Sequence, residues 1–177
     1  MNGMKQVRKL AMCAVLTALA LGLSYAERFI PLGLVVPLPG IKLGLANVVT
    51  LLTLCLVGPG AAFSVLVARC FLGSLFAGSL SGLVFSLTGG LLAMGVMTLL
   101  RNSRRLSVYG VSVCGAAAHN IGQICAAMLV MKTTVVVSYL PLLLAAAVVS
   151  GLITGAAAAG VLKASRAAGF LKKERDA

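Results

Sequence analysis

Acidic side chains are almost absent from this sequence of 177 residues, which contains fifteen Lys and Arg but only three Asp and Glu. Glu27 is the only acidic residue before position 174. A site that holds Mg²⁺ on a diphosphate needs several carboxylate ligands, and one carboxylate cannot supply them. The chain by itself therefore cannot carry out magnesium-dependent diphosphate chemistry.

Charged residues of either sign are also scarce, at 10% of the chain, whereas hydrophobic residues make up 60%. Soluble domains contain about 25% charged and about 45 to 50% apolar residues, so this composition excludes a soluble domain. One spanning helix takes about 20 residues, which leaves room for roughly six helices. The sequence predicts an all-α, polytopic membrane protein with a bundle of six transmembrane helices in one domain.

Motifs that carry catalysis or bind metals are missing as well. The chain has one His, and its five cysteines form no CxxC pair, which favours neither a zinc site nor a disulfide framework. No Walker motif, phosphate-cradling glycine loop or nucleophile-base-acid set is visible. We expect inert cysteines, no metal, no cofactor and no enzymatic activity from this chain alone.

What the chain does have is an excess of basic residues, with a net charge of +12. The clusters lack the aromatic interleaving of a nucleic-acid surface, so nucleic acid is not the expected partner. If the clusters are all cytoplasmic, the positive-inside rule predicts an even number of crossings and both termini inside a bacterial inner membrane. Eleven of the fifteen cations lie in three clusters: Lys5, Arg8 and Lys9; Arg101, Arg104 and Arg105; and Lys163, Arg166, Lys172, Lys173 and Arg175.

The apolar runs predict six spans, followed by a basic tail over residues 163–177 that lies along anionic lipid headgroups. The start of the first span also resembles a signal peptide, with a charged region, an apolar region and a small-x-small site at residues 24–26. Cleavage there would leave five crossings, and the sequence leaves this alternative open. The predicted spans are residues 10–30, 42–57, 61–76, 83–100, 108–131 and 139–162.

Few polar side chains interrupt these spans, and a polar group inside a membrane faces a cavity or a partner. Arg69 either forms a buried ion pair with Glu27 or binds an anionic ligand group, for which its planar fork is suited. Lys42 either contacts that ligand or extends to the membrane surface. We predict a binding site for a small, anionic molecule, formed by Glu27, Lys42, Asn47, Arg69, His119, Asn120 and Gln123.

A row of small residues also marks one face of the first span. Ala14, Ala18 and Gly22 recur every fourth residue, as close helix packing in a membrane requires. This face either packs within the chain or docks a separate membrane protein.

Four segments together resemble a known family. They are Glu27-Arg28-Phe29-Ile30-Pro31, the stretch from Pro39 to Asn47 (PGIKLGLAN), Arg69 with Gly73-Ser74-Leu75, and His119-Asn120-Ile121-Gly122-Gln123. The chain resembles the integral-membrane family labelled "heptaprenyl diphosphate synthase component I" or "Gx transporter". That family in turn is similar to the substrate-binding S components of energy-coupling-factor (ECF) transporters.

This resemblance implies a fold of the S-component type and a set of partners. It implies that Ala14 and Ala18 match the Ala-x-x-x-Ala pattern that contacts the transmembrane coupling subunit, with ATPases supplying the energy. It also implies that the loop over residues 31–43 covers the substrate. We expect a substrate-binding subunit for uptake.

Two other functions stay open. The chain could anchor a prenyl diphosphate synthase, or a flavin or quinone electron-transfer system, in the membrane. It could also be a self-sufficient carrier coupled to ions, although only Glu27 and His119 could then shuttle protons.

Overall fold

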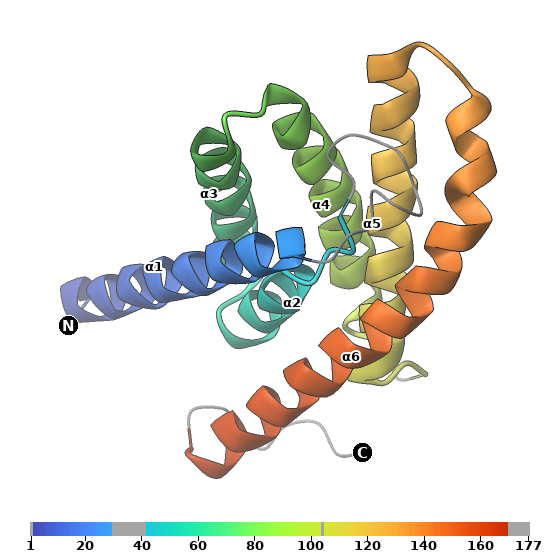
Figure 1. Cartoon of the computed structure of the whole chain (residues 1–177). Helices are drawn as coiled ribbons and strands as arrows, with labels where there is room; N and C mark the ends of the chain where they lie inside the picture. Colours follow the sequence, from blue (N-terminus) through green and yellow to red (C-terminus); the bar gives the residue numbers. More distant parts are fainter. Residues whose placement is uncertain (1, 30–41, 104, 170–177) are drawn as a thin grey trace.

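The computed structural model describes residues 2–29, 42–103 and 105–169, and within these ranges every regular element is a helix (Figure 1). Two short 3₁₀ segments, η1 (Glu27–Phe29) and η3 (Val135–Tyr139), follow α1 and precede α6. The α helices are α1 (Asn2–Ala26), α2 (Asn47–Leu56), α3 (Pro59–Ala77), α4 (Leu80–Leu100), α5 (Val108–Met131) and α6 (Leu140–Ala167).

Five of the helices, all except α2, are long and apolar enough to cross a membrane. The three tyrosines of the chain lie at helix ends: Tyr25 one residue before the end of α1, Tyr109 in the first turn of α5, and Tyr139 directly before α6. Tyrosine rings favour the boundary between lipid and water, so these positions fit helix ends at the two membrane surfaces. The protein is a polytopic membrane protein built as a helical bundle.

The second predicted span differs from the observed helix. Residues 42–57 were expected to be helical, but α2 begins only at Asn47, and residues 42–46 form a non-helical segment that we call the α2 lead-in. Ten residues at 1.5 Å each give α2 a length of about 15 Å, half the roughly 30 Å of a bilayer core. By itself α2 is therefore too short to cross the membrane, and the non-helical lead-in precedes it inside the bundle.

Short as it is, α2 is the centre of the bundle. Its first eight residues, 47–54, are all buried. Apolar side chains from the other five α helices pack with those of α2 in a single core cluster. Because neighbours surround it on every side, α2 has no lipid-facing stripe, and polar groups at its start meet protein rather than lipid.

Small residues bring α4, α5 and α6 into close contact. A Cβ atom placed on Gly122 of α5 would lie 2.8 Å from the Cα atom of Gly89 in α4, and one on Gly151 of α6 would lie 2.6 Å from the Cα atom of Val113 in α5. Main chain therefore packs on main chain, as membrane helices do where side chains are small.

Helix α1 is the least enclosed of the long helices. In its most apolar window 11% of the residues are buried, against 50% for α5, and Figure 1 shows its N-terminal half extending away from the other helices. Leu16 and Ala20 are buried, whereas Ala14 and Ala18 are exposed. The two alanines of the predicted small-residue face, Ala14 and Ala18, are therefore not packed inside the bundle.

Candidate functional site

The α2 lead-in exposes backbone amides inside the bundle, and side chains from other helices satisfy them. The carboxylate Oε1 of Glu27, in η1, accepts hydrogen bonds from the amides of Gly44 and of Leu45, the latter over 3.2 Å. Oε1 of Gln123, on α5, accepts from the amide of Lys42 over 3.3 Å. Non-helical backbone at membrane depth is stable only with such partners, so Glu27 and Gln123 hold the lead-in in place.

Gly44 allows the lead-in to approach α5. Its φ of +80° lies in the left-handed region, and a Cβ atom there would lie 2.8 Å from Cδ2 of the buried His119 ring. Because Oε1 of Gln123 is occupied by an N–H donor, its Nε2 faces His119 as the donor, and Nε2 of His119 accepts over 3.0 Å. His119 is therefore a neutral ring whose proton is on Nδ1.

Arg69 lies near the middle of α3 and is only 5% exposed. Its Nη2 donates to Oδ1 of Asn47 over 3.1 Å, while its Nε has no hydrogen-bond partner among the described residues. Among the residues that the structure describes, no ion pair joins Arg69 to Glu27. Oε1 of Glu27 instead accepts hydrogen bonds from backbone amides. Of the two predicted roles for Arg69, the structure thus lacks the buried ion pair.

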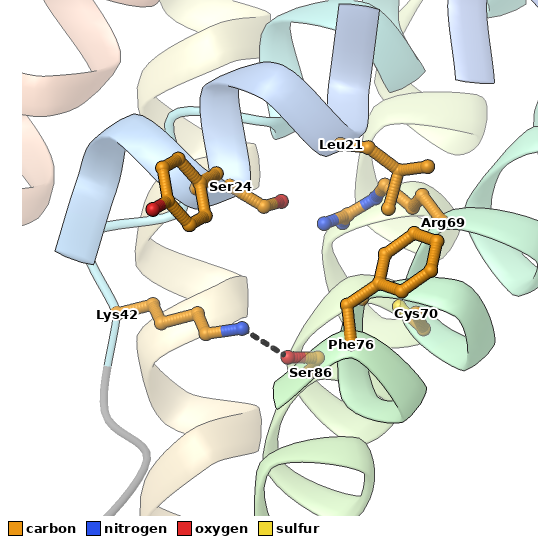
Figure 2. A pocket seen from close by; sticks show the side chains of 9 residues that line it. Leu21, Ser24, Lys42, Arg69, Cys70, Phe76 and Ser86 are labelled. Carbon is orange, nitrogen blue, oxygen red and sulfur yellow. Dashed lines mark hydrogen bonds between the residues drawn. The ribbon is translucent and has the colours of Figure 1, made fainter. Parts of the chain in front are cut away.

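A small cavity of about 50 Å³ opens beside Arg69, between α1, α3, α4 and the lead-in. Figure 2 shows the Arg69 side chain extending into this space, with Lys42 reaching toward it from the lead-in. Nζ of Lys42 donates to Oγ of Ser86 over 3.0 Å, so this cation points inward instead of extending to the membrane surface. The polar lining residues are Ser24, Lys42, Arg69 and Ser86, and the others are Leu21, Tyr25, Cys70, Gly73 and Phe76.

The structure brings six of the seven predicted site residues together. Lys42 and Arg69 line the cavity, while Glu27, Asn47, His119 and Gln123 form the hydrogen-bonded support behind it. We call these six residues the polar cluster.

Asn120 is the residue that lies apart. It is fully buried, and its Nδ2 donates to the carbonyl oxygen of Leu143 in α6 over 2.6 Å. One step along a helix turns a side chain by about 100°, so Asn120 faces α6 while His119 and Gln123, four residues apart, face the lead-in.

Several cavity-lining residues were not predicted. On α3 the missed residues are Cys70, Gly73 and Phe76, which lie on one helical face with the predicted Arg69. This spacing around a buried arginine is the signal that could have found them. The predicted lid over residues 31–43 lies mostly outside the described residues, and only Lys42 and Leu43 are described.

The described residues contain no group of three His, Cys, Asp or Glu side chains that could hold a metal ion. The polar cluster instead presents two cations and several hydrogen-bond donors to one cavity. A family model matches residues 16–161, which include the whole polar cluster. The chain belongs to the heptaprenyl diphosphate synthase component I family.

This membership covers α1 from Leu16 through most of α6. No curated protein and no solved structure matches the chain. The family description names one component of a synthase and does not state what that component does.

Proposed function

We propose that this protein is the membrane-embedded substrate-binding subunit of an uptake system and that it binds a small anionic molecule. The observation that carries the proposal is Arg69, which is buried, carries an Nε without a partner among the described residues, and lines a cavity with a second cation, Lys42. A buried arginine costs several kcal/mol in a membrane unless a partner compensates it. An anionic ligand would provide that compensation.

The non-helical backbone at the site supports the same function. Membrane proteins tolerate such backbone at membrane depth where it is buried in protein or lines a cavity, and transporters commonly bind substrates beside it. Here it is the α2 lead-in, which ends where Asn47 meets Arg69. Two cations, Lys42 and Arg69, line the cavity, and Glu27 is the one acidic residue among the described residues, so the net charge around the cavity is positive.

The proposal includes an orientation in a bacterial inner membrane with both termini in the cytoplasm. Arg101 and Arg105 follow α4, whereas the cavity residue Ser86 lies in the second turn of that helix. If basic residues stay inside, the cavity lies in the outer half of the membrane. Substrate would then enter from outside.

Transport also requires an energy source, and we propose an ATP-hydrolysing module of the ECF type as partner. Its transmembrane coupling subunit would dock on α1 at Ala14 and Ala18. Both residues are exposed on the least enclosed long helix, which supports an additional helix packing there.

Native mass spectrometry of the purified protein tests the binding step. We expect a small anion to accompany the native protein and to be lost from Arg69→Ala, because the variant lacks the cation that compensates it. Arg105→Ala is the matched control, since it removes the same charge from an exposed position outside the cavity. Failure of any anion to accompany the native protein, or equal occupancy in both variants, would contradict the proposal.

The family description favours one further function, that of a membrane subunit of a prenyl diphosphate synthase whose catalytic component is a separate chain. Purification of partners from native membranes separates the two functions. ATPases and a coupling subunit support transport, whereas a soluble synthase supports the anchoring role.

A further inference from the structure

The size of the cavity limits which part of a ligand it holds. One water-sized sphere takes about 10 to 15 Å³, so a cavity of about 50 Å³ accepts roughly three to five non-hydrogen atoms. That is the size of a carboxylate or phosphate group. Any larger ligand must continue out of the cavity.

The lining of the cavity changes character from one side to the other. Arg69, Lys42 and Ser86 form its polar side, and Leu21 of α1 and Phe76 of α3 lie beside the Arg69 side chain in Figure 2. Phe76 is 75% exposed and Tyr25, which also lines the cavity, is 61% exposed. Each ring lies one residue before the end of a helix that is long enough to span the membrane, so both are placed near the boundary between lipid and water.

We propose that the ligand is an amphiphilic anion, with a phosphate or carboxylate head beside Arg69 and Lys42 and an apolar chain that leaves between α1 and α3 into the lipid. This inference rests on the proposed anion-binding function and specifies its substrate class. The head compensates the buried guanidinium, and the chain covers the exposed ring of Phe76. The exposed rings of Tyr25 on α1 and Phe76 on α3 mark where the cavity lining reaches the outside of the bundle.

Cys70 is a natural reporter for this site. Its thiol lines the cavity and is only 3% exposed, whereas Cys125 on α5 is exposed and lies outside the cavity lining. The protein in lipid nanodiscs is treated with N-ethylmaleimide, and modification of each cysteine is followed by peptide mass spectrometry. A ligand in the cavity slows modification of Cys70 and leaves Cys125 unchanged.

The probes are matched pairs with the same head: decyl phosphate against inorganic phosphate, and decanoate against acetate. We expect the chain-bearing member of at least one pair to protect Cys70 at concentrations lower by about tenfold or more, since each buried methylene adds to affinity. The pair that protects identifies the head. Decanol and decyltrimethylammonium, which have chains but no anionic head, should not protect.

Variants locate the two ends of the ligand. Arg69→Ala should abolish protection by every anion. Phe76→Ala should weaken protection by the chain-bearing anion alone, and Phe71→Ala, which removes an exposed ring on α3 outside the cavity lining, should change nothing. All three substitutions keep Cys70 as the reporter.

The outcomes decide between the two proposals. Equal protection by chain-bearing and chainless anions overturns the amphiphile and leaves the anion-binding subunit intact. Protection by decanol equal to that by decyl phosphate or decanoate also overturns the amphiphile, because the effect would be partitioning. If Cys70 stays unmodified while Cys125 reacts fully, no lateral opening exists and the inference is wrong. No protection by any anion removes the proposed function as well.

Discussion

The two sides of this bundle are built on different principles. On one side, α4, α5 and α6 meet backbone to backbone through Gly89, Gly122 and Gly151. On the other side, α1, α3 and the α2 lead-in enclose a cavity together with Ser86 of α4, and long polar side chains bridge the gaps that helix packing leaves. The first side is a scaffold with little freedom, and the second carries the candidate site.

Buried polar groups without a hydrogen-bond partner among the described residues gather around the candidate site. They include Arg69 Nε, Asn47 Nδ2 and Thr50 Oγ1 on α2 and α3 and Nδ1 of His119 in the polar cluster, while Oδ1 of Asn120 is such a group on the scaffold side. Each such group is costly in a low-dielectric interior. Binding sites commonly keep unsatisfied groups of this kind because the ligand satisfies them.

The largest effect should come from the scaffold side. Gly122→Ala places a Cβ atom 2.8 Å from the Cα atom of Gly89 and 2.9 Å from the carbonyl oxygen of Thr88, and neither backbone atom can move aside alone. We expect destabilisation of about 2 to 3 kcal/mol, measured by thermal unfolding in detergent. The control is Gly95→Ala on α4, where nothing lies within 4 Å and the better helix propensity of Ala is free to act. Equal melting temperatures for the two variants would disprove close packing.

The next effect concerns the boundary between the two sides, at Gly44. Gly44→Ala forces an L-residue to φ +80° and pushes its Cβ atom against His119 and Asn47. Gly78→Ala meets the same kind of strain at φ +60° but with nothing within 4 Å, so its expected cost is about 1 to 2 kcal/mol. We expect Gly44→Ala to cost more than this control in thermal unfolding and also to weaken anion binding. A Gly44 variant with the control's stability and full binding would rule out a close fit of the lead-in on His119.

The two buried asparagines test the comparison directly. Asn120→Ala removes a bond to α6 on the scaffold side and should lower stability by about 1 to 2 kcal/mol without changing anion binding. Asn47→Ala removes the acceptor that orients Arg69 and should weaken anion binding by about tenfold. Stability is read from thermal unfolding, and binding from native mass spectrometry. If Asn120→Ala impairs binding as much as Asn47→Ala, the division into scaffold and site is wrong.

Composition alone was sufficient to predict a helical membrane protein, because 60% apolar residues leave no soluble alternative. The start of α2 was not predictable in this way. A lysine, a glycine and apolar residues fit a helix start as well as an extended segment, and the segment is stabilised by Glu27 and Gln123, which are distant in sequence. Hydropathy contains no information on such bonds.

The site was predicted from the rarity of polar residues in apolar spans. This rule correctly selected Arg69 and Lys42, which line the cavity, and Asn47, which contacts Arg69. It failed to separate Asn120 from His119, because it counted polar residues on one helix without knowing which neighbour each face meets. The apolar lining was missed for the converse reason. In an apolar chain, Leu21 and Phe76 look like every other lipid-facing residue.

The smallest effect should come from a hydrogen bond inside the scaffold. Oγ of Ser112 on α5 and Oγ1 of Thr154 on α6 lie 2.9 Å apart, and Thr154 also bonds the carbonyl of Ser150 in its own helix. Because Thr154 keeps that second partner, a double-mutant cycle of Ser112→Ala and Thr154→Val should give a coupling of only about 0.6 kcal/mol, the average for such bonds between membrane helices. Thermal or chemical unfolding of the four proteins measures it. A coupling above about 2 kcal/mol would mean that side-chain bonding, rather than backbone contact at glycines, holds α5 on α6, and the contrast between the two sides would no longer stand.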